Sequence, residues 1–548
     1  MFKKIFRQPV NSITIAAALV ALSSLASRFL GVFRDRILAG EFGAGTSLDI
    51  YYAAFRVPDL IFNLVVLGAL SAGFIPVFTA LIKDFSCERK KGCDSSRENH
   101  LAWGLASNVL NFLLLGLGII SLLGIIFAQP LTRLITPGFS SSDQELVAQL
   151  TRIMFLSPLF LGISGIFGGI LQSFRRFLVY SLSPIFYNLG IIIGALYFVD
   201  LWGLAGLAWG VVLGAFCHMA IQVPLVYHLG FRYQWRIFWH DVNTWKIWKM
   251  MVPRTLSLAI SQINLVVITI IASGLSSGSL AVFNLANNLQ SFPIGIFGIS
   301  FAIAAFPALS QSAFDTEKLS ASFSQTMRQI LFFIVPATVF IIILRAQIIR
   351  VILGTGNFDW NNTILTMNTL GFFALSLFAQ ATLPLLTRVF YARHDSSTPL
   401  YFGFLTVLLN IGLSLFLGSR MGVAGLALAF SLANICNFIF LWLAMYFKIG
   451  HLDIGNILKS VLKFTASAIA AGSIAQVMKV IVWPFIDMTR FSGVFIQLGT
   501  SIFSGLVIYL LLCYLLGSEE LSGFMSALKN RWPFRKVKVG DQGEARGV

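Results

Sequence analysis

Charged side chains are scarce in this sequence: Asp, Glu, Lys and Arg make up 11% of its 548 residues, whereas a soluble globular domain carries about 25%. So few charges cannot cover a water-facing surface, which excludes an ordinary soluble protein. Apolar side chains take their place, since 57% of the residues are hydrophobic and the mean hydropathy is +0.83. The solvent of most of this chain is therefore lipid.

Cysteine is also scarce, with five residues at positions 87, 93, 217, 436 and 513. Three of them lie in apolar segments, and Cys87 and Cys93 share a polar loop that has no His or Cys at the spacing of a zinc site. We interpret all five as reduced, structural thiols. No nucleophile–base set, metal-ligand set or nucleotide-binding motif is apparent, so we expect no cofactor and no enzymatic activity.

Acidic residues are outnumbered by basic ones, which gives a formal net charge of +17. In a soluble protein this excess would suggest nucleic acid, but in a membrane protein topology explains it better and we expect no nucleic-acid partner. With alternate loops assigned to opposite sides, 27 of the 39 Lys and Arg residues fall on one side and seven on the other. Because basic residues collect in cytoplasmic loops, this bias places both termini in the cytoplasm.

The apolar residues form runs of about twenty, rich in Leu, Ile, Phe and Gly, without the alternation of barrel strands. They predict an all-α integral membrane protein with about 14 transmembrane helices. The N-terminal run could pass for a signal peptide, but it continues to Arg28 without a convincing cleavage site, and we reject that interpretation. The predicted segments are 11–38, 48–82, 101–128, 145–173, 179–199, 203–229, 248–274, 279–309, 324–346, 363–391, 398–418, 422–447, 458–484 and 494–517.

An internal repeat is visible six helices apart. Gly203-Leu-Ala-Gly-Leu-Ala208 opens the sixth segment and Gly422-Val-Ala-Gly-Leu-Ala427 opens the twelfth, and Asn188-Leu-Gly190 is echoed by Asn410-Ile-Gly412 just upstream. The alternative is generic packing of small residues, but matching neighbours favour two parallel six-helix repeats plus two extra C-terminal helices. The predicted parts are an N-lobe (1–229), an interfacial linker (230–250), a C-lobe (251–448), helices 13 and 14 (449–517) and a basic cytoplasmic tail (518–548).

Polar side chains form stripes along four of the predicted helices, at spacings of three and four that place each set on one helical face. A polar stripe on an apolar helix faces another helix or a watery cavity, because lipid cannot solvate it. The repeat relates helices 1 and 2 to 7 and 8, so we expect one central cavity between the halves. The stripes are Ser24, Arg28, Gly31 and Asp35; Asp49, Tyr52, Arg56, Asp59 and Asn63; Arg254, Ser257, Ser261 and Asn264; and Asn284, Asn287, Asn288 and Ser291.

Ion pairing accounts for only part of this charge. We expect Arg28 to pair with Asp35, and Arg56 to pair with Asp49 or Asp59. The alternative for the Ser and Asn residues is hydrogen bonding across packed helices.

Two cations, Arg34 and Arg254, have no evident local carboxylate. An unpaired buried cation calls for an anionic ligand, and cations outnumber acids in the expected cavity, which favours an anionic substrate. The candidate site comprises Arg28, Arg34, Arg56, Arg254, Asp35, Asp49, Asp59, Asn287 and Asn288.

Several motifs resemble the MurJ/MviN family, most specifically in the first 80 residues. These are SRFLGVFRD at 27–35, FGAG at 42–45, Asp49, AFRVP at 54–58, GALS at 68–71 and FIPVF at 74–78; later matches are Pro253-Arg254, SQIN at 261–264, Ser291-Phe-Pro293 and Phe306-Pro307. The resemblance implies a flippase of the bacterial cytoplasmic membrane. It would move lipid II, the undecaprenyl-pyrophosphate-linked peptidoglycan precursor, to the outer leaflet, among membrane lipids and cell-wall synthesis proteins.

The resemblance also assigns roles to individual residues. The family's cavity cations correspond to Arg28, Arg34 and Arg56, with Asp35 and Asp49 as acidic partners. The sequence departs from the family on two helices. Further along helix 2, many relatives carry a basic residue where this chain has Phe62 or Asn63, and a glutamate where it has Leu67. On helix 8, many relatives carry an arginine where this chain has Asn288. Arg254 is the candidate to replace that charge, and helices 13 and 14 are expected to form a groove for the lipid tail.

Two rival functions stay open at the level of sequence. A drug/cation antiporter of the same superfamily would need a cavity carboxylate that exchanges protons or sodium, and here the asparagines at positions 264, 410, 434 and 437 offer only weak cation ligands. A flippase for another lipid-linked oligosaccharide is separated from a lipid II flippase only by the helix 1 motif.

The stretch 231–250 carries Trp235, Trp239, Trp245 and Trp248 among basic residues. Tryptophan gathers at membrane–water interfaces, so we expect this linker to lie at the cytoplasmic headgroups. The basic tail after Lys529 is expected to be attracted to anionic lipid.

Overall fold

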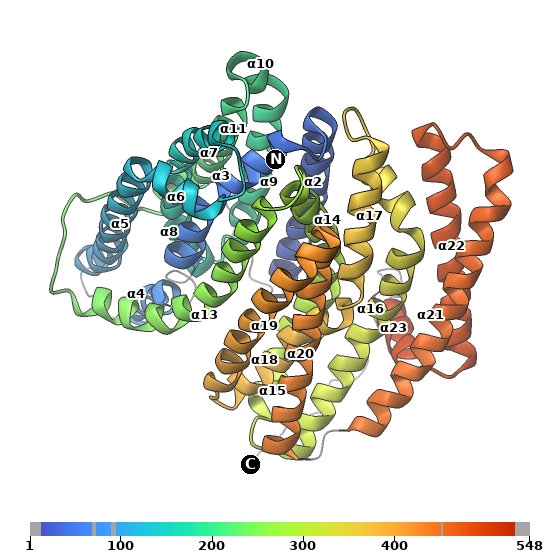
Figure 1. The fold of residues 1–548 in the computed structure, drawn as a ribbon. Coiled ribbons are helices and arrows are strands. Elements are labelled where there is room, and N and C mark those ends of the chain that lie inside the picture. Colours follow the sequence, from blue (N-terminus) through green and yellow to red (C-terminus); the bar gives the residue numbers. More distant parts are fainter. Residues whose placement is uncertain (1–12, 68–72, 89–94, 451–452, 532–548) are drawn as a thin grey trace, which may run out of the picture.

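The computed structural model describes residues 13–67, 73–88, 95–450 and 453–531, and regular structure in these ranges is entirely helical (Figure 1). In chain order the helices are α2 (Ile13–Phe42), α3 (Thr46–Phe62), η1 (Asn63–Leu67), α4 (Ile75–Glu88), α5 (Ser95–Ile126), α6 (Ala128–Ile135), α7 (Ser141–Met154), α8 (Ser157–Ser173), α9 (Phe177–Ile193), η3 (Gly194–Phe198), α10 (Val199–Trp202), α11 (Ala205–Ala220), α12 (Val223–His228), α13 (Val242–Ser273), α14 (Ser279–Pro293), η4 (Ile294–Ile299), α15 (Ser300–Gln311), α16 (Thr316–Ile352), α17 (Trp360–Ala374), α18 (Leu377–Ala392), α19 (Ser397–Met421), α20 (Val423–Ile449), α21 (Ile454–Val482), η5 (Trp483–Phe485), α22 (Phe491–Leu515) and α23 (Glu519–Arg531).

The membrane-spanning character of the fold is confirmed. Ten helices in the described ranges are long and apolar enough to cross a bilayer, and α17 with α18, bent by 45° at their junction, makes an eleventh. The predicted segments outside this set are 11–38, 48–82 and 248–274, and these are the three whose polar stripes contain charged residues. The protein is therefore a multi-pass, all-helical membrane protein, and the number of fourteen spans stays a prediction.

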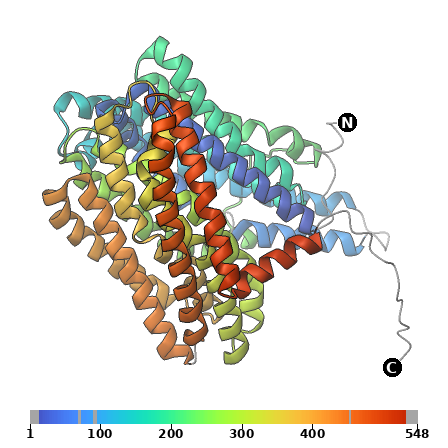
Figure 2. The ribbon, with the colours of Figure 1, turned by 90° about the vertical axis from the view of Figure 1, so that its right-hand side faces the viewer.

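The buried side chains form three clusters. One lies within residues 66–251, a second within residues 302–521, and a third joins both halves of the chain through α2, α3, α14 and their neighbours. Helices α21 and α22 lie side by side at one edge of the molecule, against α16 (Figures 1 and 2). This arrangement is compatible with the predicted division into lobes, whose boundaries remain a prediction.

The two copies of the glycine motif adopt the same backbone conformation. Gly203 has φ 58° and ψ −144°, and Gly422 has φ 60° and ψ −141°, a region that side chains disfavour. A β-carbon on Gly206 would stand 2.3 Å from the backbone of Phe198, and one on Gly425 would stand 2.1 Å from the carbonyl oxygen of Leu417. Each copy thus makes the same sharp turn and the same close helix approach, which supports duplication over generic packing.

Helices 2 and 8 of the predicted repeat both contain a π-helical segment. The first follows α3 as η1 and the second follows α14 as η4. Such bulges are rare and often occur at functional sites. Their matching places agree with the correspondence that the repeat predicts.

The linker between the two halves is bound to α5 by side-chain amides. Asn108 donates to the carbonyl of Phe238 and accepts from its N–H, while Asn111 donates to the carbonyls of Gln234 and Arg236. These hydrogen bonds hold the non-helical residues 231–238 against α5. The second part of the predicted linker forms the first turns of α13. The exposed side chain of Trp235 agrees with an interfacial position.

Candidate functional site

The charged residues of helix 1 form a network that joins three helices. Arg34 on α2 donates to Asp35 Oδ1 at 2.7 Å and to Asn188 Oδ1 of α9 at 3.1 Å. The other carboxylate oxygen, Asp35 Oδ2, accepts a hydrogen bond from Asn288 of α14 at 2.9 Å. Asp35 is buried, so its charge is stabilised by a guanidinium from its own helix and an amide from across the interface between the halves.

Arg56 on α3 also reaches across this interface. Its Nε donates to Thr269 Oγ1 of α13 at 2.9 Å, and its Nη2 donates to Asn284 Oδ1 of α14 at 3.3 Å. The residue is buried, and Asp59, one turn away, interacts with it electrostatically without a close ion pair. Helices 2, 7 and 8 are thereby joined through one guanidinium.

Asp49 caps the beginning of α14. Its Oδ2 accepts a hydrogen bond from the backbone N–H of Gly278 at 2.6 Å, and its Oδ1 accepts one from Ala281 at 2.7 Å. A carboxylate at a helix N-terminus satisfies free N–H groups and complements the helix dipole. Asp49 therefore fastens helix 2 to helix 8 through the backbone.

Further contacts close the same side of the molecule, which is the side predicted to be extracytoplasmic. The backbone N–H of Asn357 donates to Gly40 O at 2.7 Å, and its side chain donates to Glu41 O at 2.6 Å. Thr46 Oγ1 and Ser277 Oγ lie 2.6 Å apart. The segment 36–49 is thus bound to the C-terminal half, and we call this set of contacts, with those of Asp49, the outer seam.

A cavity of about 520 Å³ opens beside Arg28, nearer the opposite side. Its lining comes from α2, α3, α4, α8, α9 and α11, and it includes Ser24, Gln172, Tyr180 and His218. Arg28 is half-buried, and within the described ranges its guanidinium has no hydrogen-bond or ion-pair partner. This cation is therefore available to an anion that enters the cavity.

Arg28 also touches the C-terminal half. A β-carbon on Gly295 of η4 would stand 2.3 Å from Cζ of Arg28, so the guanidinium packs directly on the glycine backbone. The cavity wall thus belongs to the N-terminal half, while the cation at its edge contacts a π-helical segment of helix 8.

A buried polar network lies in the cavity wall. Ser164 Oγ and His218 Nδ1 are 2.6 Å apart, and Gln222 Nε2 donates to the same hydroxyl. The three residues join α8 to the end of α11, and Ser164 and His218 themselves line the cavity. They shape its polar surface.

Two predicted pairings are wrong, and so is the expectation that Arg34 has no local carboxylate. Asp35 binds Arg34 rather than Arg28, because a flexible arginine can fold back onto the neighbouring residue and Arg28 points toward Gly295. Asp49 does not pair with Arg56, because both of its oxygens accept from backbone N–H groups.

The remaining predicted site residues divide between two situations. Asn288 contacts Asp35, whereas Asn287 accepts a hydrogen bond from Gln290 of its own helix at 2.9 Å. The side chain of Arg254 lies outside the described residues. The structure thus brings helices 1, 2, 7 and 8 together as expected, but Arg34 and Arg56 lie in a packed interface and only Arg28 of the described cations lines the cavity.

An apolar groove of about 580 Å³ lies between α16, α18, α20 and α21. Its lining includes Leu331, Val335, Phe378, Trp442 and Val461. Apolar surface of this kind accommodates hydrocarbon chains.

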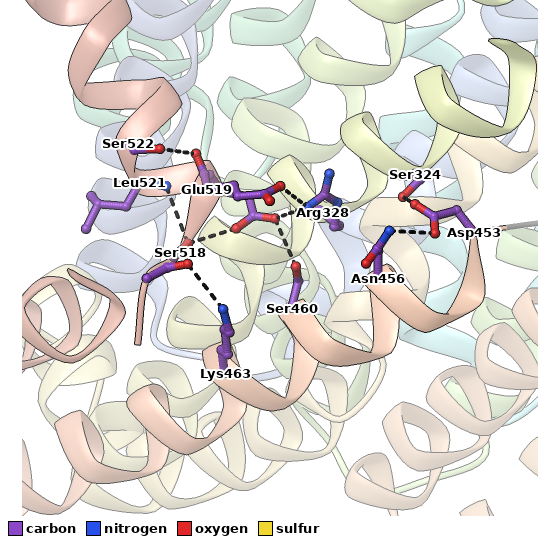
Figure 3. Close-up of polar contacts among 12 residues, drawn as sticks. Ser324, Arg328, Asp453, Asn456, Ser460, Lys463, Ser518, Glu519, Leu521 and Ser522 are labelled. Atoms are coloured by element: carbon purple, nitrogen blue, oxygen red, sulfur yellow. Dashed lines mark hydrogen bonds and ion pairs between the residues drawn. The ribbon is translucent and has the colours of Figure 1, made fainter. Parts of the chain in front are cut away.

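A polar cluster lies where α16, α21 and α23 meet (Figure 3). Arg328 of α16 pairs with Glu519 at 2.9 Å and with Glu520 at 3.0 Å, both on α23. Ser460 of α21 donates to Glu520 at 3.0 Å. The helix that follows the last span, α23, is therefore attached to α16 and α21, two of the four helices that line the groove.

Four asparagines named in the sequence meet in a second polar cavity of about 400 Å³. Asn264, Asn410, Asn434 and Asn437 line it between α13, α19 and α20. None of its lining residues is a carboxylate. Within the described ranges, no group of three His, Cys, Asp or Glu residues could hold a metal ion, and Cys217, Cys436 and Cys513 are free thiols.

Comparison with known proteins decides the family. The family model described as lipid II flippase MurJ matches residues 38–495. The chain belongs to the MurJ family. Among curated MurJ proteins, the probable lipid II flippase of Rhizobium tropici is 27% identical over 93% of this chain and 96% of its own length. That of Buchnera aphidicola subsp. Acyrthosiphon pisum is 29% identical over 78% of this chain and 82% of its own length.

Solved structures share the MurJ fold. A lipid II flippase MurJ in an inward closed conformation matches with a TM-score of 0.72 and 23% identity, over 93% of this chain and all of that one. An inward-facing multidrug resistance transporter of the MATE family, from the MOP superfamily, matches with a TM-score of 0.63 and 16% identity, over 80% and 99% of the two chains. The predicted resemblance to MurJ is confirmed.

Sequence reasoning missed two members of the site. Asn188 was noticed only as part of the repeat, although it accepts from Arg34, and Gly295 was not noticed at all. A signal for Asn188 existed, since an amide in an apolar helix calls for a partner.

Proposed function

We propose that this MurJ-family protein is a lipid II flippase of the bacterial cytoplasmic membrane, with both termini in the cytoplasm. It carries the undecaprenyl-pyrophosphate-linked peptidoglycan precursor from the inner to the outer leaflet. The single observation that supports this most directly is Arg28, a cation without a partner among the described residues at the edge of a cavity. Membership of the MurJ family indicates which anion is transported, and the positive charge of Arg28 attracts that anion into the cavity.

A pyrophosphate cannot cross hydrocarbon alone, because burying an isolated charge is prohibitively costly. A guanidinium replaces part of its hydration with charge-assisted, bidentate hydrogen bonds. Arg28 makes the first contact in this proposal, and Arg254 supplies the second cation that the family's helix 8 arginine provides elsewhere. Asn287 and Asn288 border the path as neutral donors.

Arg34, Arg56, Asp35, Asp49 and Asp59 act through the interface between the two halves. In the conformation described here Asp35, Asp49 and Arg56 bind residues of helices 7 and 8 and keep the two halves joined on the outer side. Arg34 holds Asp35 from the same helix, and Asp59 lies one turn from Arg56. Arg28 contacts η4 of the C-terminal half, so an anion that binds Arg28 acts at the interface between the two halves. The two six-helix halves then rock and open the outer side, as alternating access requires.

The lipid tail stays in the bilayer during this movement. The apolar groove between α16, α18, α20 and α21 offers it a surface. Helix 13 (α21) lines this groove, whereas no residue of helix 14 (α22) does, so a groove formed by helices 13 and 14 together stays a prediction. A cytoplasm-negative potential favours outward movement of an anion by about 2.3 kcal/mol per charge per 100 mV, so the potential contributes to the driving force.

A strain depleted of its own lipid II flippase tests the proposal. Expression of this chain should restore growth, and Arg28→Ala or Arg34→Ala should abolish rescue at unchanged protein level. The control is Arg420→Ala, which removes a cation stacked on Phe416 on the predicted outer side, away from the site. A properly inserted wild-type chain that leaves the strain unable to grow would contradict the assignment to lipid II. Rescue of a strain lacking another lipid-linked oligosaccharide flippase would then favour the rival substrate.

A further inference from the structure

Two cations of the C-terminal half take no part in the site described above. Arg345 lies on α16 and Lys479 lies on α21, within segments that cross the membrane. Both side chains are half-buried, and neither has a carboxylate partner among the described residues. Charged groups inside a spanning segment are costly, and long cationic side chains near a helix end usually extend toward the headgroups instead.

The surroundings hold these two side chains in place. Lys479 Nζ donates to the carbonyl of Ile343 at 3.3 Å. The guanidinium of Arg345 packs on Gly371 of α17, where a β-carbon would stand 2.6 Å from Nη1. Because Lys479 binds the carbonyl two residues before Arg345, the two cations are neighbours on facing helices and their positive charges repel each other. The charged ends of both side chains, and not only their stems, therefore contact the protein.

Buried amides complete the setting. Gln347 donates to Gln497 Oε1 at 3.0 Å, and Gln497 donates to the carbonyl of Lys479 at 3.0 Å. Both glutamines are at least nine-tenths buried. They join α16, α21 and α22 at this level and fix the backbone from which Lys479 projects.

The two cations lie on the same helical faces as the apolar groove. Arg345 follows the groove residue Met327 by 18 residues, and Lys479 follows the groove residue Val461 by 18 residues. At about 3.6 residues per turn, each interval is about five turns and about 27 Å along the axis. One pair of helices thus presents apolar surface toward one side of the membrane and two positive charges toward the other.

We propose that Arg345 and Lys479 form a binding site for a lipid phosphate at the outer-leaflet end of this helix pair. The ligand class is a phosphate or pyrophosphate headgroup that carries apolar chains. The planar guanidinium suits bidentate contact with phosphate and the ammonium adds a point charge, so one anion would relieve the repulsion between them. The assignment to the outer leaflet rests on the orientation in the proposed function. There the site would hold the headgroup after it leaves Arg28.

Lipid binding to the purified full-length protein tests this site. Native mass spectrometry would follow binding of undecaprenyl pyrophosphate, phosphatidylglycerol and, as a zwitterionic reference whose ammonium group offsets the phosphate charge, phosphatidylcholine. In the double variant Arg345→Gln/Lys479→Gln we expect affinity for at least one anionic lipid to fall about tenfold or more, with phosphatidylcholine unchanged. The matched control is Arg420→Gln/Arg490→Gln, which removes two cations from the same side, one stacked on Phe416 and one paired with Asp487, and should bind as the wild type does.

The outcomes separate the possible sources of the phosphate. If the double glutamine variant loses affinity for both anionic lipids, the site is a general lipid-phosphate site. If it loses affinity for only one of them, that lipid is the preferred ligand. Unchanged binding of both overturns the proposal. The charge-conserving variant Arg345→Lys/Lys479→Arg should bind anionic lipid with an affinity within about threefold of wild type. If the glutamine pair does not fold, Arg345→Gln alone should lower this affinity about fivefold. An unchanged affinity of that single variant would also overturn the site. Because binding is measured without transport, this result is independent of whether Arg28→Ala abolishes rescue.

Discussion

The guanidinium of Arg28 rests on the backbone of Gly295, so that a β-carbon on that glycine would stand 2.3 Å from Cζ of the arginine. Helix 1 and helix 8 therefore meet through a cation and a residue without a side chain. In Gly295→Ala the end of Arg28 must move, and it can do so because the arginine is flexible.

We expect Gly295→Ala to keep its fold and lose about tenfold in lipid II transport, equivalent to about 1.4 kcal/mol, because the cation is displaced from the cavity edge. Rescue of a flippase-depleted strain at graded expression measures the loss. Gly118→Ala on α5, where a β-carbon meets nothing within 4 Å, should transport normally. Equal activity of the two variants would show that the position of Arg28 is unimportant.

The cap that Asp49 forms on α14 should control the outer seam. Asp49→Ala removes two charge-assisted hydrogen bonds to backbone N–H groups, which destabilises the closed state by about 2 kcal/mol and raises the open population about thirtyfold. A cysteine at Ala44, which is buried in the closed seam, in a chain without the native cysteines, should react faster with an impermeant thiol reagent.

Asp315→Ala provides the control for this experiment. Asp315 caps α16 through Lys318 N at 3.1 Å, on the predicted cytoplasmic side and away from the outer seam. Its loss should leave the labelling rate unchanged. An effect as large as that of Asp49→Ala would mean that general destabilisation, and not the seam, exposes the probe.

The polar cluster around Arg328 offers two glutamates in contrasting environments. The side chain of Glu520 is 6% exposed and that of Glu519 is 80% exposed, although both pair with the same guanidinium. Glu520→Gln should cost about 1–3 kcal/mol, because it weakens a buried pair, and Glu519→Gln less than about 1 kcal/mol. Thermal unfolding in detergent, followed with proteolysis of α23, should show this order, and the reverse order would contradict the importance of burial.

A pH-dependent contribution to stability is expected between α18 and α19. Although partial burial opposes ionisation, hydrogen bonds from Lys448 and Thr398 lower the pKa of Asp395 to about 2. Because the pKa is below its ordinary value, the stabilisation is complete above about pH 4 and disappears as the pH falls toward 2.

Asp395→Asn should therefore lower stability by about 1 kcal/mol near neutral pH, and the difference from wild type should shrink between pH 4 and pH 2. Lys448→Gln should cause a similar loss, and the double variant little more, because both changes remove one interaction. A deficit of Asp395→Asn that stays constant down to pH 2 would exclude ionisation as its cause.

The helices and the identity of the faces that meet could be predicted from the sequence. Apolar runs and polar spacings of three and four residues are local patterns, and they identified helices 1, 2, 7 and 8 as the ones that share the interface. The repeat was visible because Gly203 and Gly422 each need a backbone region that other residues avoid.

The partners of the charged groups could not be predicted in the same way. Asp49 binds the backbone of another helix, and any residue there offers the same N–H group, so no sequence signal marks it. The contact between Arg28 and Gly295 likewise depends on how two helices that are far apart in the sequence pack together. Spacing along one helix gives the face of a side chain, but not what lies opposite.

The most direct test measures the lipid II exposed on the outer face of the membrane. Cells whose only flippase is this protein would be treated with an externally added enzyme that cleaves lipid II, and the cleaved fraction would be compared between wild type and Arg28→Gln at equal protein level. We expect wild type to expose lipid II and Arg28→Gln to retain it in the inner leaflet. Equal cleavage in both would contradict the role of the Arg28 guanidinium as the group that receives the pyrophosphate.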